Sequence, residues 1–307
     1  MNDILIALTD MVASPLMQRS LIAAILIGLA APVVGTYLVD RRLAMLGDGI
    51  GHISLTGVAL GWLAGTVANA NPHDQWAIPG AVIVSILGAV TIELVRQSGR
   101  TSADVALAML FYGGIAGGVL LIGIAGGTSA QLTSYLFGSI TTVNWTDIWM
   151  ISILSIVILI VGIGLSPALR SVTHDEEFAR STGLPVNALS MLIAILSALT
   201  VAVAMRVVGS LLVSALMIIP VAISQLSARS FHATMRQAMA LGALICTIGL
   251  ILTYFVDLSP GAAIVVLAIG IYGAVFAGKS LVSAIIRGTK VRSGEASQKP
   301  STGLLGR

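Results

Sequence analysis

Apolar residues run along this chain in nine long stretches that are separated by short polar segments. The first stretch, residues 20–39, contains no charged side chain. A helix rises about 1.5 Å per residue, so roughly twenty apolar residues span the ~30 Å hydrocarbon core of a bilayer. The pattern therefore predicts an all-α polytopic membrane protein in which one membrane domain uses nearly the whole chain.

Nine membrane helices are predicted by these stretches, near residues 20–40, 43–68, 76–96, 103–126, 146–166, 186–205, 207–226, 237–256 and 260–286. The weakest division lies at Arg206, inside a continuous apolar run from 186 to 226, which can form two helices or one long broken segment. We therefore expect eight or nine membrane helices. We assign residues 1–287 to the membrane domain and the polar end of the chain, 288–307, to a disordered cytoplasmic tail.

Composition agrees with a membrane protein, because 57% of the residues are hydrophobic, 9% are charged and the mean hydropathy is +1.01. The net charge of +3 is small and the basic residues form no patch, so we expect no nucleic acid partner. The lone cysteine, Cys246, lies inside an apolar run, which excludes a disulfide framework and a thiolate metal cluster. We expect it to be a small core residue.

The basic residues predict how the helices are oriented, since Lys and Arg are retained on the cytoplasmic side of a membrane. With nine helices and the amino terminus outside, fourteen of the sixteen basic residues face inward, and only Arg19 and Arg206 do not. The external loops at 69–75, 127–145 and 257–259 contain no Lys or Arg. We therefore expect a multi-pass protein of the cell membrane with a cytoplasmic carboxyl terminus.

One sequence motif suggests nucleotide binding but stands in the wrong context. Residues 273–280 read GAVFAGKS, which matches the phosphate-binding pattern G-x-x-x-x-G-K-[ST]. The match lies inside the last apolar run, and only 27 residues follow Ser280, too few for the rest of a nucleotide-hydrolysing domain. We predict that the chain is no enzyme and that any ATP hydrolysis takes place on another chain.

Glycines spaced four apart predict close helix packing, because small residues let the backbones of membrane helices approach. The predicted contacts involve four pairs: Gly47 and Gly51, Gly57 and Gly61, Gly113 and Gly117, and Gly114 and Gly118.

Asp48 and His52 are ionisable residues at the start of the second predicted helix, and their four-residue spacing places both side chains on one face. A carboxylate near the bilayer centre costs about 2.5–3.5 kcal/mol or more, so it normally faces a pore or a partner. Carboxylate and imidazole together suit a divalent first-row cation, and two symmetry-related chains would supply four ligands. Alternatively, Asp48 pairs with Arg41 and Arg42 at the interface and His52 is a packing residue.

Other polar residues within or beside the predicted helices are more simply explained. We expect Glu93 to pair with Arg96, three residues later on one helix. We expect Asp104, close behind Ser102, to interact with the positive end of a helix dipole. His73 and Asp74 fall in an external loop, where they either contact arriving metal or face water, and we favour water.

A short helix at 174–183 is predicted by its end signals, in the segment SVTHDEEFARSTGLPV. Thr173 and Glu176 match a capping box, Gly183 fits the left-handed position after a helix, and Pro185 prevents continuation. By its charges the segment is cytoplasmic, and it is either a docking site for a partner or a solvated connector.

Three stretches together resemble the permease subunit of the ABC importers for zinc, manganese and iron. They are RRLAMLGDGIGHISLTGVALG, similar to the family's signature on its second helix, HDEEFARSTG, similar to its coupling segment, and VVGSLLVSALMIIPVAISQL, similar to the helix that follows. They stand in the family's order, the segment LTSYLFGSI at 132–140 also fits, and the resemblance covers about residues 15–285.

The resemblance implies a homodimeric pore with a type II ABC importer fold, fed by an extracytoplasmic metal-binding protein and driven by two cytoplasmic ATPase subunits. It implies that Asp48 and His52 coordinate the metal in the translocation path. It also implies that the ATPase docks on the segment with His174, Asp175, Glu176, Glu177, Ala179 and Gly183. Zinc, manganese or iron would be the transported substrate, and no permanently bound cofactor is expected.

Two rival functions remain open on sequence alone. In a proton-coupled secondary metal transporter, protonation of Asp48 or His52 would exchange for metal and no ATPase would be needed. Such a carrier does not require the capped cytoplasmic helix. An ABC permease for a metal chelate such as a siderophore or cobalamin would favour a wide, neutral pore without the Asp and His pair.

Overall fold

The computed structural model describes residues 11, 13–68, 73–99, 102–126, 128–139, 143–256 and 258–297, and all regular structure within these ranges is helical. The elements are α2 (Pro15–Asp40), α3 (Leu46–Val67), the 3-10 helix η1 (His73–Trp76), α4 (Ala77–Ser98), α5 (Ala103–Ile124), α6 (Ser129–Phe137), α7 (Trp145–Gly164), α8 (Ser166–His174), α9 (Glu176–Ser181), α10 (Val186–Val208), α11 (Val213–Ser227), α12 (Phe231–Phe255) and α13 (Pro260–Ser297).

Eight of the described helices are long and apolar enough to cross a membrane: α2, α3, α4, α5, α7, α10, α12 and the first part of α13. The ninth apolar helix, α11, has 15 residues and is about 22 Å long, too short to cross alone. The run from 186 to 226 therefore forms two helices. They separate at Gly209, whose φ of 88° an L-residue with a side chain rarely adopts. The predicted all-α membrane fold is confirmed.

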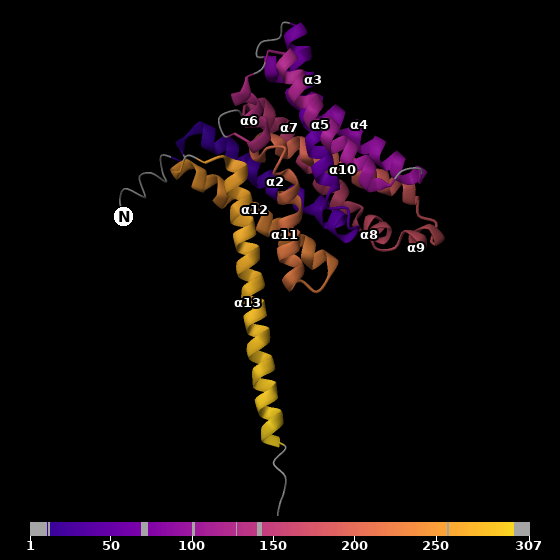
Figure 1. Ribbon diagram of the computed structural model, residues 1–307, viewed down its shortest axis with the longest axis vertical. Helices are drawn as coiled ribbons and strands as arrows, with labels where there is room; N and C mark the ends of the chain where they lie inside the picture. The colour runs from indigo at the N-terminus through magenta and orange to yellow at the C-terminus, as the bar shows by residue number, and fades with distance from the viewer. Residues whose placement is uncertain are drawn as a thin grey trace, which may run out of the picture.

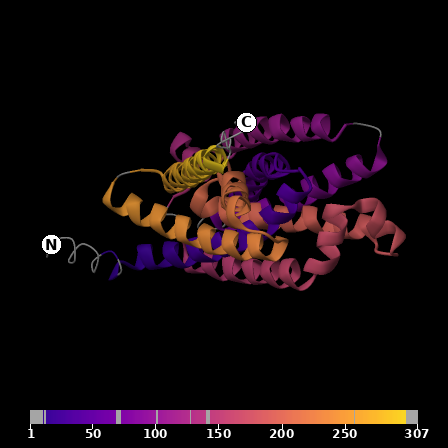
Figure 2. The same ribbon diagram turned by 90° about the horizontal axis from the view of Figure 1, so that it is seen from below.

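α2 and α10 lie at the centre of the bundle and are its most buried long helices. α3 packs between α4 and α5 on one side, whereas α12 and α11 pack against α2 on the other (Figure 1). α13 leaves the bundle at a steep angle to α12 and extends beyond it, as the second view confirms (Figure 2). This arrangement makes α3 the link between the central helices and α5.

Four helix ends differ from the sequence prediction by five residues or more. α2 begins at Pro15 instead of 20, and α11 begins at Val213 instead of 207, after the break at Gly209; the other two ends are in α12 and α13. α12 begins at Phe231, earlier than expected, because the Ser230 hydroxyl accepts a hydrogen bond from the Ala233 N–H and caps the first turn. α13 runs past residue 287 to Ser297, so the first part of the predicted disordered tail is helical, and the sequence has no proline between Pro260 and Pro300 to stop it. Residues 298–307 lie outside the described ranges, and the division into domain and tail stays a prediction.

Glycines allow the helices around α3 to approach at backbone distance. A Cβ atom added at Gly57 would lie 2.5 Å from the Gly80 carbonyl oxygen, and one at Gly114 would lie 2.5 Å from the His52 backbone. Of the glycines expected at helix contacts, seven have a neighbouring segment within 4 Å, and Gly113 faces open space. The prediction is therefore confirmed for three pairs and wrong at Gly113.

Gly114→Val should lower the stability of the bundle far more than Gly113→Val. Both changes place the same side chain in the same helix, but only the Gly114 side chain would collide with the α3 backbone. Overpacking of this kind costs about 1–3 kcal/mol. Thermal unfolding of the two purified variants in detergent measures the difference, and equal midpoints would contradict the described packing of α5 on α3.

Candidate functional site

α3 begins directly after a tight connection from α2, in which Arg42 adopts a left-handed φ of 60°. Asp48 lies in the first turn of α3, where the helix dipole stabilises a negative charge, and His52 lies one turn later. Glycines stand at 47, 49 and 51, directly beside these two residues in the helix. A Cβ at Gly51 would lie 2.8 Å from the Ser210 carbonyl oxygen, so the segment before α11 packs against this turn of α3.

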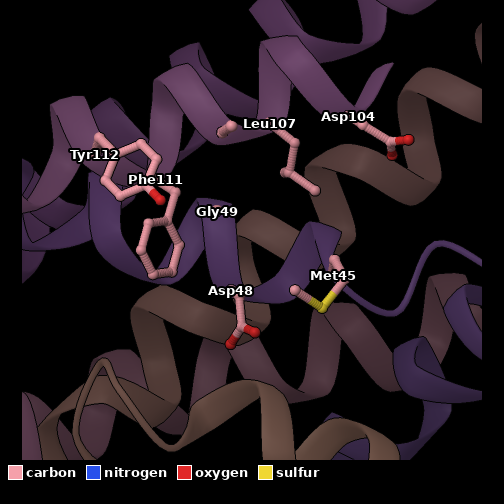
Figure 3. Close-up of a pocket in the computed structure, with 8 residues that line it drawn as sticks. Met45, Asp48, Gly49, Asp104, Leu107, Phe111 and Tyr112 are labelled. Atoms are coloured by element: carbon pink, nitrogen blue, oxygen red, sulfur yellow. The ribbon is translucent and has the colours of Figure 1, made fainter. Parts of the chain in front are cut away.

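Asp48 is one of the residues that line a cavity of about 390 Å³ between α3 and α5 (Figure 3). Its carboxylate accepts a hydrogen bond from the Ser214 hydroxyl near the start of α11. Eight described residues line the cavity: Met45, Asp48, Gly49, Asp104, Leu107, Ala108, Phe111 and Tyr112. No ion pair joins Asp48 to Arg41 or Arg42 in the described part of the chain, and Arg41 bonds elsewhere, so the interfacial alternative for Asp48 is not what the structure shows.

His52 is nearly enclosed, with 3% of its surface exposed, and it is not among the residues that line the cavity. Its Nδ1 atom is buried and has no hydrogen-bond partner among the described residues. The ring of Phe111 from α5 stands edge-on to the imidazole, with ring centroids 4.1 Å apart and planes at 71°. The structure therefore places Asp48 and His52 on one face of α3 but opens only Asp48 to the cavity.

Asp104 is a second carboxylate of the cavity, a position that its local sequence did not predict. It lies in the first turn of α5 behind the Ser102 cap, as expected, and it is exposed. It also lines a smaller cavity of about 90 Å³ together with Arg42, Glu93 and Arg96. Asp104 thus borders both the Asp48 cavity and a charged cavity, which only the packing of α5 on α3 reveals.

No three or more His, Cys, Asp or Glu side chains come together as a metal site within the described ranges of this one chain. A carboxylate and an imidazole are the ligands that α3 offers, and such oxygen and nitrogen donors suit manganese, iron and zinc alike. A stable coordination shell at Asp48 and His52 would need further ligands, either from water or from another molecule.

The segment at 174–183 forms α9, but its cap differs from the prediction. The Asp175 carboxylate accepts a hydrogen bond of 2.9 Å from the Phe178 N–H, so Asp175 is the N-cap. The expected capping box of Thr173 and Glu176 is wrong, because Thr173 belongs to the preceding helix α8 and its hydroxyl bonds to Asp40 at 3.2 Å. Gly183 has the expected left-handed φ, 81°, and Pro185 precedes α10.

Glu176 bridges two arginines from different helices. Its carboxylate pairs with Arg41 at the end of α2 and, at 3.3 Å, with Arg96 near the end of α4. Arg96 also holds Glu93 through two bonds of 2.8 and 2.9 Å, which confirms the predicted pair of Glu93 and Arg96. Arg41 in turn donates to the Ser190 hydroxyl of α10 at 2.8 Å. This charge network joins α9 to the ends of α2 and α4 and to the beginning of α10.

Burial lowers the pKa of the Arg41 guanidinium, and the nearby Glu176 carboxylate opposes that shift. Because the ordinary pKa of arginine lies far above neutral, Arg41 stays charged and needs its partner. Only 4% of the Arg41 side chain is exposed, compared with 39% for Glu176.

The other side of α9 faces away from the bundle. Ala179 is fully buried against the protein, whereas Phe178 is 61% exposed. The neighbours His174, Asp175, Glu177 and Gly183 are exposed as well. α9 lies at the edge of the bundle (Figure 1), so an apolar ring surrounded by charges is presented at the surface. Such an exposed aromatic is typical of an interaction site.

Arg206 lies near the end of α10, where it forms a buried ion pair that the sequence analysis missed. Its guanidinium is 3.5 Å from the Asp147 carboxylate of α7, and the two side chains are 3% and 9% exposed. It also stands over the Tyr135 ring, 5.6 Å from the ring centre. Backbone hydrogen bonds from Ser210 to Tyr135 and from Leu211 to Leu136 attach α6 to this break.

The other described residues considered from the sequence lie outside the Asp48 cavity and the charge network of Glu176. Cys246 is fully buried and unbonded, as expected for a core residue. Residues 273–280 lie within α13 and form no loop, which agrees with rejecting the phosphate-binding motif. His73 and Asp74 begin η1, and their side chains are outside the described part.

Comparison with known proteins decides the family. The protein-family model for the ABC 3 transport family matches residues 13–279 of this chain. The chain belongs to the ABC 3 transport family. This confirms the resemblance to metal ABC importer permeases, and the ABC 3 family consists of transport subunits rather than enzymes.

The chain is similar to membrane proteins of manganese and zinc transport systems and to a solved structure. It is 32% identical to the manganese transport system membrane protein MntC of Halalkalibacterium halodurans, over 85% of this chain and 86% of that protein. It is 29% identical to the high-affinity zinc uptake system membrane protein ZnuB of Haemophilus influenzae, over 80% of this chain and 91% of that protein. A solved structure, PsaBC from Streptococcus pneumoniae in complex with Fab, matches with a TM-score of 0.78 and 28% identity, over 89% of this chain and 95% of that one.

Proposed function

We propose that this chain is the membrane permease subunit of an ATP-driven importer of divalent transition-metal ions, with manganese or zinc as the transported ion. The observation that carries the proposal is the ABC 3 match over residues 13–279. The manganese and zinc relatives support this ion class. The donor set of Asp48 and His52 is compatible with both ions, and with iron.

The ion passes the Asp48 cavity and is coordinated by Asp48 and His52. Support comes from Asp48, which lines a cavity of about 390 Å³ together with a second acidic residue, Asp104. Because one chain offers a single carboxylate and imidazole pair, two chains related by a two-fold axis would complete a four-ligand shell. We therefore propose a homodimer whose pore places both pairs along the path. Coordination must be moderate, since a rigid four-ligand cage would retain the ion.

A separate ATPase dimer docks on the outward face of α9, around Phe178 and Glu177. The exposed aromatic ring and its charged neighbours support this role, as does the short, well-capped helix itself. An extracytoplasmic binding protein delivers the ion to the opposite end. The positions of Lys and Arg support a cytoplasmic α9 and carboxyl terminus and an amino terminus outside. In this arrangement α11 and the preceding residues 209–212 together form the ninth crossing.

The rival functions fit the chain less well. A proton-coupled carrier has no need for α9, and ABC 3 membership favours an ATP-driven importer. A bulky neutral chelate would suit a wide apolar pore, whereas the Asp48 cavity carries two carboxylates.

Co-purification tests the ATPase partner. A tagged chain expressed with its neighbouring genes should retain an ABC ATPase, and Phe178→Ala should weaken that association by about 30-fold, the effect of losing a central aromatic contact of about 2 kcal/mol. Trp76→Ala is the matched control, because Trp76 is 50% exposed and belongs to η1, between α3 and α4 and away from α9. Absence of any ATPase, or equal loss in both variants, would count against docking on α9.

A further inference from the structure

His52 has a buried ring nitrogen without a hydrogen-bond partner among the described residues. This atom is Nδ1, and the imidazole that carries it is almost fully buried. Leaving a buried polar atom unpaired costs about 1–3 kcal/mol. A protein can retain this unfavourable arrangement when the nitrogen has a binding role in another conformation. The lone pair of a neutral imidazole nitrogen can bind a first-row metal ion.

Phe111 occupies the position between His52 and the cavity. Its ring contacts the imidazole edge-on at 4.1 Å, and the same side chain is one of the cavity-lining residues. Figure 3 shows the ring projecting from α5 toward the part of α3 that carries Asp48 and Gly49. Phe111 thus touches both His52 and the cavity that Asp48 lines.

The ring has room to move, because Phe111 is only half-buried and borders about 390 Å³ of open volume. The backbone beside it is fixed, since Gly114 lies against the His52 backbone and leaves no slack between α5 and α3. Movement of the side chain, rather than separation of the two helices, is therefore the simplest way to expose the imidazole.

We propose that Phe111 is a positioning residue of transport, whose ring shields His52 until it turns away and lets His52 and Asp48 bind the same ion. This inference rests on the proposed function. The shield keeps the ligand pair incomplete while the cavity is empty. A cation entering the cavity then meets the Asp48 carboxylate first and gains the imidazole only after the ring has moved.

Chemical modification of His52 tests the shield directly. The chain contains four histidines, so His73→Gln, His174→Gln and His232→Gln leave His52 as the only imidazole. In this background, diethyl pyrocarbonate should modify His52 at least about tenfold faster after Phe111→Ala, as followed by mass spectrometry of the purified chain. Tyr112→Ala is the matched control, because Tyr112 lines the same cavity and is 70% exposed but has no ring contact with His52.

Equal rates with and without the Phe111 ring, or an equal acceleration by Tyr112→Ala, would overturn the inference. Phe111→Val serves as a second variant with the same expected direction if the alanine variant does not elute as a monodisperse species. Zn²⁺ should protect the exposed His52 in Phe111→Ala, and Asp48→Asn should remove the protection. A faster reaction that Zn²⁺ does not slow would keep the shield but contradict the metal site, so the two failures are distinguishable.

Discussion

Asp48→Asn should lower metal uptake by more than tenfold. Asparagine keeps the shape of the side chain and can still accept the Ser214 hydrogen bond, but it removes the negative charge. A neutral amide oxygen is a weaker ligand for a divalent cation, and a loss of about 1.4 kcal/mol already corresponds to a factor of ten. Uptake of radioactive manganese and zinc by cells that lack other importers measures the effect.

Asp104→Asn is the matched control for this experiment. It removes the same charge from the same cavity, but Asp104 lies on α5, away from the Asp48 and His52 pair. We expect it to reduce uptake less than about threefold, through the weaker general attraction of the cavity for cations. Undiminished uptake by Asp48→Asn, or equal losses in the two variants, would remove Asp48 from the coordination site.

Glu176→Gln should separate ATP hydrolysis from transport, with uptake reduced about tenfold or more while the ATPase stays bound. The Glu176 carboxylate ties α9 to Arg41, at the end of the helix that leads through a short connection to Asp48. Without it, movement of α9 is no longer transmitted to the start of α3. Removing one partner of a fully buried ion pair lowers the stability of the fold by about 3–5 kcal/mol, because the other charge is left unpaired. The cost is smaller here, because Glu176 is 39% exposed.

Glu177→Gln provides the control for Glu176→Gln, since the same substitution then falls on the exposed face of α9. It should weaken retention of the ATPase without lowering uptake per bound ATPase. Hydrolysis and uptake by the purified complex are measured together. If Glu176→Gln releases the ATPase as Phe178→Ala does, Glu176 acts in docking and the charge network does not transmit movement.

Hydrophobic length alone predicted most of the helices, because a bilayer requires about twenty apolar residues for each crossing. The same criterion missed the start of α12, where His232, Thr234 and Arg236 interrupt the apolar run and Ser230 supplies the cap. It also placed the break of the 186–226 run at Arg206. The chain breaks at Gly209 instead, and Arg206 stays helical because Asp147, far away in sequence, neutralises it.

The candidate site was predicted as separate residues, whereas their relationships depend on packing. The spacing of Asp48 and His52 put them on one face, but the Phe111 ring that contacts His52 comes from another helix. Glu176 looked like half of a capping box, because its neighbour Thr173 has the right spacing. Its arginine partners lie 135 and 80 residues away, and local patterns carry no information about such contacts.

The most direct test of ATP-driven metal import uses sealed vesicles that contain the purified chain with its ATPase, its binding protein and radioactive manganese or zinc. We predict that the ion accumulates only when ATP is supplied to the ATPase side, and that an imposed proton gradient has no effect. Accumulation driven by the proton gradient in the absence of ATP would contradict the account.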